Sequence, residues 1–388
     1  MNKNRLFQLL SYVLVAVMTA TITVAVILFS GVDAVGKSKL QQLEDLILDR
    51  YVGEADQTKL EDAAASAMIG ALGDRWSYYL TAKEYDSHYE QEQNAYVGIG
   101  VAIDAQNYQD GMHVLSVTAG GPAEEAGILA QDRIIAVDGQ NIVGMELDAV
   151  QPMIKGKENT TVELTILRDG KELTLTVTRK TIRTPVATAQ MLKDGIGLVT
   201  IENFNVNCAK ETVAAIERLL EDGAEKLIFD VRNNPGGRVS ELVKVLDYLL
   251  PEGVVFRSED YNGKTDENTS DADCLEMPMA VIVNGNSYSA AEFFAAALRE
   301  KDWAKVIGEQ TSGKGYYQMM YRLLDGSAVG LSVGKYYTAG GKSLEGVGIT
   351  PHVMAPVDEN TAAAIYAGAL EPEEDPQIQA AVKALKSE

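Results

Sequence analysis

A long apolar run occupies the N-terminal end of the chain. No charged residue occurs between Arg5 and Asp33, and the residues in this interval are mostly apolar. A helix needs about 20 such residues to cross a bilayer. The pattern therefore predicts a transmembrane anchor over 9–30, preceded by a short tail at 1–8.

The charges that flank this run predict its orientation. Lys3 and Arg5 precede it, and the next basic residue is Lys37. Because positive charge favours the cytoplasmic side, we expect a single-pass protein of the cytoplasmic membrane, with its N-terminus inside and the rest of the chain extracytoplasmic. The alternative is a cleaved signal peptide with a weak cleavage site at Val32-Asp33-Ala34, although the apolar cores of signal peptides span only about 7–15 residues.

The periodicity changes twice after this run. Region 31–93 is expected to be helical, since leucines such as Leu40 and Leu43 recur on one helix face. Region 94–181 consists of short alternating or β-branched runs separated by Gly, Asp and Asn, which predicts a small β-domain. Within it, Asp169-Gly170 reads as a hairpin turn between two strands.

Region 182–357 alternates strand patterns with amphipathic helix patterns. One such helix begins at Cys208 and ends at Gly223, and the buried strand K-L-I-F-D-V-R follows it. This rhythm is typical of an α/β domain. An acidic, Ala-rich tail at 358–388 completes the chain, with a short helix expected from Pro376 to Leu385. The predicted fold class is therefore multidomain α/β.

Composition narrows the possible partners. The 388 residues carry a formal net charge of −22, which disfavours nucleic acid and anionic membrane surfaces because phosphates would be repelled. Two cysteines, Cys208 and Cys274, are too few for a disulfide framework or a zinc site. Whether the two form a single bridge stays open.

The string G-E-Q-T-S-G-K-G, from Gly308 to Gly315, nearly matches the nucleotide-binding loop G-x-x-x-x-G-K-[ST]. Gly315 stands where a magnesium-binding hydroxyl is needed, and a nucleotide loop also requires a helix after it. The residues that follow, Y-Y-Q-M-M-Y-R, predict a strand that leads through an Asp-Gly turn into a second strand. We therefore expect no nucleotide site here, and Lys314 needs another role.

Ser289 lies at a predicted turn from a strand into an apolar helix. The sequence S-A-A-E, Ser289–Glu292, is also a capping box, so one interpretation is that both residues only cap the helix. The other is that Ser289 is a nucleophile, since backbone N–H groups at a helix N-terminus can hold an oxyanion.

A nucleophilic serine needs a base, and the three histidines lie in unsuitable contexts. A lysine can serve instead if burial lowers its pKa, because desolvation disfavours the ammonium form. Lys314 lies between two glycines in an otherwise uncharged segment. It is therefore a candidate base, and the alternative is a solvated lysine in a turn.

These residues resemble the carboxy-terminal processing peptidases, the tail-specific Ser-Lys proteases of peptidase family S41, over about residues 40 to 385. The family pattern N-x-x-S-A-S-A-x-E appears as N-G-N-S-Y-S-A-A-E, and G-E-x-T-x-G-K-G appears as G-E-Q-T-S-G-K-G. The resemblance implies that Ser289 is the nucleophile and Lys314 the general base. Gln318 would orient the lysine, and Glu292 would support the site.

A third family motif, D-x-R-x-N-P-G-G, appears as D-V-R-N-N-P-G-G. The resemblance implies an oxyanion hole built from the amide of Ala290 and a glycine amide of this turn. Gly236 and Gly237 are both candidates for that glycine. The resemblance implies a protease core at 182–357 and no cofactor or metal.

The β-domain at 94–181 resembles a PDZ module. Its Y-V-G-I-G-V string lies where the carboxylate-binding loop belongs, so the resemblance implies that Val97, Gly98, Ile99 and Gly100 receive the C-terminus of a protein or peptide substrate. Pro152 departs from the family pattern, since it lies in the helix expected to line the groove and removes a helical hydrogen bond.

The sequence thus predicts a membrane-anchored serine endopeptidase that recognises protein C-termini. A catalytically silent PDZ adaptor, in which Ser289 is only a helix cap, is the alternative from another class. A homo-oligomer is compatible with either prediction.

Overall fold

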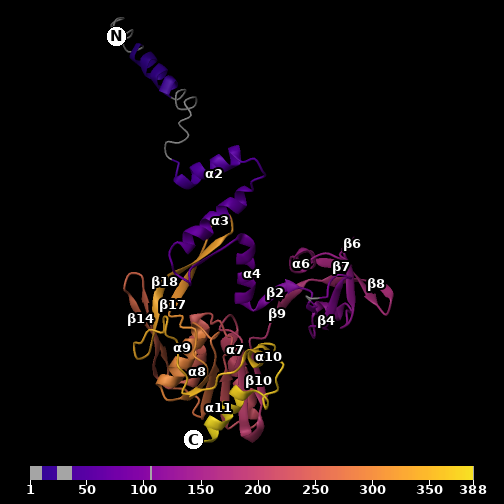
Figure 1. Cartoon of the computed structure of the whole chain (residues 1–388), viewed down its shortest axis with the longest axis vertical. Coiled ribbons are helices and arrows are strands. Elements are labelled where there is room, and N and C mark those ends of the chain that lie inside the picture. The colour runs from indigo at the N-terminus through magenta and orange to yellow at the C-terminus, as the bar shows by residue number, and fades with distance from the viewer. Residues whose placement is uncertain (1–10, 24–36, 105–106, 388) are drawn as a thin grey trace, which may run out of the picture. The chain divides into compact units, whose positions relative to one another are not determined.

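The computed structural model describes residues 11–23, 37–104 and 107–387, in two compact units, 1–81 and 82–388 (Figure 1). In the first unit, residues 11–23 are helical, and they are followed by α2 (Lys39–Arg50), α3 (Gln57–Gly70) and β1 (Tyr78–Leu80). Across the described residues, no helix has both the length and the apolar character needed to cross a membrane. The anchor predicted at 9–30 lies partly outside these residues.

The second unit begins with α4 (Ala82–Gln93), which leads into the small β-domain. Strand β2 (Ala95–Gly98) pairs with β9 (Lys180–Arg183) at the two ends of this domain. Between them lies a sheet of order β3-β4-β5-β7-β8, with β6 at the edge of β5. Its elements are β3 (Val101–Ile103), β4 (Met112–Val117), α5 (Pro122–Glu125), β5 (Arg133–Val137), β6 (Gln140–Asn141), α6 (Leu147–Ile154), β7 (Thr161–Arg168) and β8 (Lys171–Thr178).

The predicted hairpin turn of this domain is confirmed. Strands β7 and β8 pair antiparallel from Arg168↔Lys171 onward. Asp169 and Gly170 have φ values of 50° and 75°, the left-handed conformation that a two-residue turn of this kind requires.

The α/β core is built on a six-stranded sheet of order β10-β11-β12-β15-β16-β19, in which only β10 is antiparallel. The strands and the short helix η2 are β10 (Ala187–Met191), η2 (Lys193–Gly195), β11 (Ile196–Ile201), β12 (Lys226–Asp230), β15 (Met279–Val283), β16 (Ala304–Gly308) and β19 (Val353–Met354). The helices of the core are α7 (Cys208–Glu221), α8 (Val239–Leu249), α9 (Ala290–Glu300), α10 (Glu359–Tyr366) and α11 (Pro376–Lys386).

Alternate residues of these strands enter two different hydrophobic clusters. Leu227 and Phe229 of β12 pack with α7, α8 and α9 on one face, whereas Ile228 packs with α11 on the other. Strands covered on both faces have continuous apolar sequences, which explains why K-L-I-F and M-A-V-I-V contain so few polar residues.

A second set of paired strands carries the segment after Lys314: β17 pairs with β18, β18 with β13, and β13 with β14. Its strands are β13 (Gly253–Asp260), β14 (Thr265–Ser270), β17 (Tyr316–Arg322) and β18 (Ala328–Thr338). The expected strand, turn and strand after Lys314 are therefore confirmed, and no helix follows the lysine directly.

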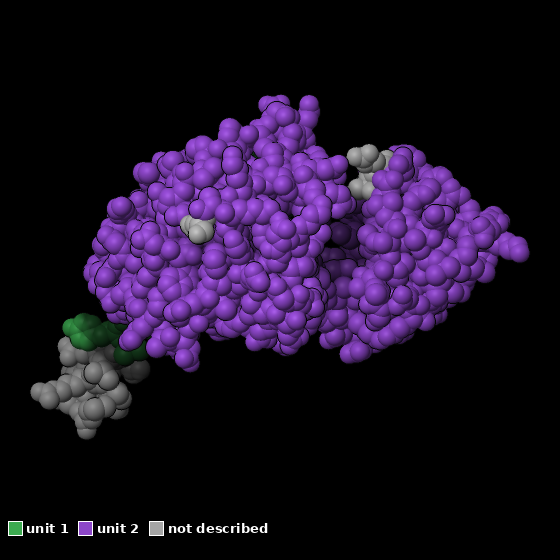
Figure 2. Space-filling view, turned by 90° about the horizontal axis from the view of Figure 1, so that it is seen from below, with its two compact units in different colours: residues 1–81 green, residues 82–388 purple. Residues whose placement is uncertain are grey.

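Figure 2 shows the second unit in purple, hollowed between a larger and a smaller lobe.

A buried ion cluster ties α11 to the end of β12. Arg232 donates to both carboxylate oxygens of Asp230, at 2.9 and 2.5 Å, and lies 2.8 Å from Asp375, the N-cap of α11. Burial alone would lower the pKa of Arg232, but the two carboxylates outweigh it and raise that pKa. At the other end of the helix, Lys226 donates to the carbonyl of Leu385 at 2.7 Å. The C-terminal helix is thus fastened at both ends.

Replacing Arg232 should destabilise the fold strongly. In Arg232→Ala, two buried carboxylates lose their counter-charge, which costs about 3–5 kcal/mol of unfolding free energy. Urea unfolding of the purified variant measures this. As a control, Arg257→Ala removes a partly exposed ion pair with Glu267 and should cost about 1 kcal/mol or less. Equal costs for the two variants would contradict the assigned role of Arg232.

Candidate active site

The candidate nucleophile lies at a strained turn between β15 and α9. Ser289 has φ 58° and ψ −122°, a conformation that costs free energy for any residue other than glycine. Nine consecutive residues of α9, from Ala290 to Leu298, are buried. This packing fixes the entry angle of the helix and holds Ser289 half-buried at its N-terminus.

Glu292 forms the reciprocal half of the predicted capping box and does more than cap the helix. Its Oε2 accepts from the N–H of Ser289 at 3.0 Å, and the same oxygen accepts from the N–H of Lys314 at 2.8 Å. Its Oε1 accepts from the Thr311 hydroxyl at 2.6 Å and from the N–H of Gly313 at 2.8 Å. The side chain is fully buried. One carboxylate therefore holds together the two segments that carry the candidate nucleophile and the candidate base.

The loop that carries Lys314 is held close to the protein by its glycines. A Cβ on Gly313 would lie 2.9 Å from the backbone nitrogen of Val347, and one on Gly315 would lie 2.7 Å from that of Glu345. The side chain of Lys314 extends toward the nucleophile turn, since its Nζ lies 5.6 Å from the ring centroid of Tyr288. Lys314 is half-buried. The structure thus brings the backbones of Ser289 and Lys314 together and places the lysine side chain over the residue that precedes Ser289.

The two candidate oxyanion glycines have different surroundings. A Cβ on Gly236 would lie 2.9 Å from the backbone nitrogen of Ala290 and from Cβ of Ser289, so this turn lies directly against the nucleophile. The N–H of Gly236, however, donates to Oδ1 of Asn234 at 2.8 Å. The hydrogen bonds of the described residues give no acceptor for the N–H of Gly237 or of Ala290. Among the described residues, the amides of Gly237 and Ala290 are thus the candidates that no protein acceptor occupies.

Side-chain amides join the glycine turn to the nucleophile turn. Asn284 accepts from the N–H of Asn233 and donates back to its Oδ1, both at 2.9 Å. Ser287, fully buried, donates to the carbonyl of Val231 at 2.7 Å. Sequence reasoning assigned no role to these residues, although N-N-P-G-G and N-G-N-S are conspicuous polar runs at the ends of two apolar strands.

Gln318 lies on β17, on the strand that follows Lys314. Its Nε2 donates to Oγ of Ser332 at 2.9 Å and to the carbonyl of Tyr316 at 3.3 Å. These bonds fix the orientation of the amide beside the loop that carries the lysine.

The candidate C-terminus groove of the β-domain is a pocket of about 100 Å³ between the β2–β3 turn and α6. Gly98, Ile99 and Gly100 line it, whereas Val97 is not among its lining residues and pairs with Thr181 of β9. Pro152 lies inside α6, and the helix continues beyond it to Ile154.

The Cys208 thiol is not an alternative nucleophile. Both cysteines are free, so they form no bridge. Burial raises the pKa of the Cys208 thiol to about 12, which keeps it protonated at neutral pH. In the part of the chain that the structure describes, no three His, Cys, Asp or Glu side chains are grouped so that they could hold a metal ion.

Comparisons with known proteins show the family of this chain. The model of peptidase family S41 matches residues 195–355, and that of the PDZ domain matches residues 113–168. A probable CtpA-like serine protease of Staphylococcus aureus (strain COL) is 34% identical over 348 residues, which cover 86% of this chain and 69% of the relative. The corresponding protein of Staphylococcus haemolyticus (strain JCSC1435) is 32% identical over 366 residues, 90% of this chain and 73% of the relative.

A solved structure supports the fold. The putative S41 protease of Bacteroides fragilis (strain NCTC 9343) superposes with a TM-score of 0.51 at 15% identity, over 89% of this chain and 97% of the other. The resemblance inferred from the three motifs is therefore confirmed. The chain belongs to peptidase family S41, the carboxy-terminal processing serine proteases, and carries a PDZ domain.

Proposed function

We propose that this protein is a membrane-anchored endopeptidase that captures protein C-termini in its PDZ groove and cleaves them by a Ser-Lys dyad. The observation that carries the proposal is the Glu292 carboxylate, which accepts hydrogen bonds from the backbones of both Ser289 and Lys314. If Glu292 only capped α9, it would not need to bind the backbone of the loop that carries Lys314. The catalytic part lies outside the cytoplasm, and the apolar run at 9–30 is the anchor.

In the first chemical step, the neutral amine of Lys314 takes the proton of the Ser289 hydroxyl while Oγ attacks the scissile carbonyl. The carbonyl oxygen becomes an oxyanion, which the amides of Ala290 and Gly237 stabilise. The tetrahedral intermediate then collapses. The C–N bond breaks, and the ammonium of Lys314 gives its proton to the leaving amine, so that an ester of Ser289 remains.

Water completes the cycle. Lys314, neutral again, takes a proton from a water molecule that attacks the ester, and a second oxyanion forms in the same hole. Collapse of this intermediate releases the new C-terminus and returns the proton to Oγ of Ser289. Lys314 must be neutral at the start of each of the two steps in which it acts as the base.

Capture of a C-terminus is supported by the shape of the PDZ groove. Gly98, Ile99 and Gly100 form one wall and α6 forms the other. Backbone N–H groups in such a loop bind a carboxylate, while the last substrate residues extend along the neighbouring strand.

Removing either member of the dyad should abolish proteolysis. We expect Ser289→Ala and Lys314→Ala to lower kcat/KM for an unstructured substrate such as casein by about 10³-fold or more. Lys314→Arg should be equally inactive, because a guanidinium stays protonated and cannot act as a base.

The control for these variants is Lys342→Arg, at an exposed position, which should retain wild-type activity. All variants should bind a C-terminal peptide as the wild type does. More than a tenth of the wild-type activity in Lys314→Arg would refute the assigned base, and wild-type activity in Ser289→Ala would refute the nucleophile. Inactive wild type with intact peptide binding would instead support the silent adaptor.

Replacing the carboxylate of Glu292 should uncouple the two segments. In Glu292→Gln, one acceptor oxygen becomes an NH₂ group that faces two donors, which we expect to cost about 2–4 kcal/mol of stability. It should also lower kcat about 100-fold. Because Glu292 is a positioning residue, the affinity for a C-terminal peptide should not change.

The matched control is Glu300→Gln at the other end of α9. Its carboxylate accepts from Thr338 and Gly340 near the surface, and we expect kcat to stay within about twofold of the wild type, as at most surface positions. Chemical unfolding and steady-state kinetics measure both effects. An unchanged kcat in Glu292→Gln would contradict the clamp.

Recognition of the free C-terminus can be tested without altering the protein. A peptide that ends in a carboxamide should bind to Ser289→Ala at least about tenfold more weakly than the same peptide with a free carboxylate, because it loses charge-assisted hydrogen bonds. Fluorescence anisotropy measures both dissociation constants. Equal affinities would exclude C-terminus recognition by the groove.

A further inference from the structure

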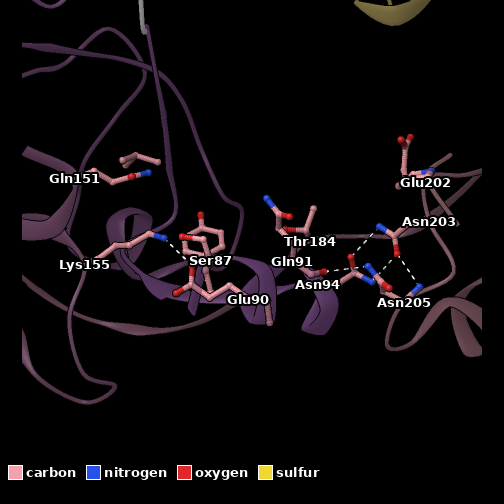
Figure 3. A pocket seen from close by; sticks show the side chains of 14 residues that line it. Ser87, Glu90, Gln91, Asn94, Gln151, Lys155, Thr184, Glu202, Asn203 and Asn205 are labelled. Atoms are coloured by element: carbon pink, nitrogen blue, oxygen red, sulfur yellow. Dashed lines mark hydrogen bonds and ion pairs between the residues drawn. The ribbon is translucent and has the colours of Figure 1, made fainter. Parts of the chain in front are cut away.

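A cavity of about 650 Å³ lies between the β-domain and the α/β core (Figure 3). Its walls come from α4, β2, β3, α6 and the segments that flank β10 and β11. The lining residues are Ser87, Glu90, Gln91, Asn94, Ala95, Tyr96, Val101, Gln151, Lys155, Thr184, Glu202, Asn203, Asn205 and Pro235.

The cavity extends from the PDZ groove to Pro235, in the turn that carries the candidate oxyanion glycines. At one end, Tyr96, Val101, Gln151 and Lys155 also line the PDZ groove. At the other end, Pro235 immediately precedes the oxyanion glycines. A polypeptide held by its C-terminus in the groove and by its scissile bond at Ser289 would therefore have its intervening residues in this cavity.

The walls are suited to an extended backbone of any sequence. They carry five side-chain amides, from Gln91, Asn94, Gln151, Asn203 and Asn205. Asn94 and Asn203 hold each other by reciprocal amide bonds at 3.1 and 2.9 Å, and the N–H of Asn205 donates to Asn203 at 2.9 Å (Figure 3). Carboxamides both donate and accept hydrogen bonds, as peptide groups do.

The charged side chains of these walls leave a net negative charge. Of the three charged residues, Glu90 and Lys155 form an ion pair of 2.7 Å. Glu202 remains, and the described residues provide its carboxylate with no ion pair or side-chain hydrogen bond. Figure 3 shows it at the end of the cavity remote from Lys155. Glu202 is exposed in the cavity, so its carboxylate is accessible to a substrate cation, and desolvation and the nearby charge of Asp230 both raise its pKa.

We propose that this cavity is a substrate subsite that selects a lysine or arginine in the segment between the captured C-terminus and the scissile bond, with Glu202 as the residue that determines the preference. An acidic residue at the same point meets an uncompensated carboxylate and is disfavoured. The inference rests on the proposed function, because it assumes that one chain engages both sites.

A lysine scan tests the subsite. Peptides of about 16 residues, roughly 50 Å when extended, share one C-terminus and an otherwise uncharged sequence. Each carries a single lysine or a single glutamate at successive positions. Binding to Ser289→Ala is measured by fluorescence anisotropy, and cleavage by the wild type is measured by mass spectrometry.

We expect one window of positions at which the lysine peptide binds about three- to tenfold more tightly than the glutamate peptide, as is typical of a partly solvated charge pair. Glu202→Gln should bring this ratio close to one. Glu221→Gln removes the same charge from an exposed residue outside the cavity and should leave the ratio unchanged. Thermal unfolding checks that both variants are folded.

The outcomes separate the two claims. Equal lysine and glutamate affinities at every position, or a ratio that survives Glu202→Gln, would overturn the subsite while leaving the peptidase intact. Loss of cleavage in every peptide with the lysine window retained would instead overturn the Ser-Lys mechanism and leave the subsite standing.

Discussion

The carboxylate of Glu292 has no contact with solvent, so its charge must be stabilised entirely by hydrogen bonds inside the protein. Four donors do this, and they come from the N-terminus of α9 and from the loop before β17. Helix α9 and strand β16 separate these segments in the sequence. One segment follows a strand of the parallel sheet, and the other leads into the second sheet. The relative position of the two sheets is thus fixed where the chemistry is proposed to occur.

The remaining geometry of the site follows from how polar turns end buried strands. Strands β12 and β15 are parallel neighbours, so their carboxyl ends place the turns that begin at Val231 and Asn284 side by side. Polar groups in such turns lose water when the helices pack, and they must find partners in each other. The amide pair of Asn233 and Asn284 and the Ser287 hydroxyl supply these partners. Rigid turns of this kind would keep the proposed oxyanion donors in place before the substrate arrives.

Local pattern was sufficient for much of the fold, whereas the residues of the candidate site were proposed from motif resemblance. Periodicity predicted the hairpin at Asp169-Gly170, the strand pair after Lys314 and the C-terminal helix, because each depends on neighbouring residues. The choice between Gly236 and Gly237 could not be made from sequence, since it depends on Asn234 accepting a bond from one of the two amides. The ion cluster of Arg232 and Asp375 could not be predicted from the sequence either, because its members lie far apart in the chain. The proposal that residues 9–30 form a membrane anchor rests on hydropathy alone.

The fastening of α11 has a consequence for a member of a protease family. Leu385 is completely buried and its carbonyl is bound by Lys226, while Asp375 secures the start of the helix. A protease engages its target as an extended strand, and this helix would have to unwind and leave the sheet before it could be cut. The fold therefore shields α11 from neighbouring copies, and cleavage within this helix has to wait for local unfolding.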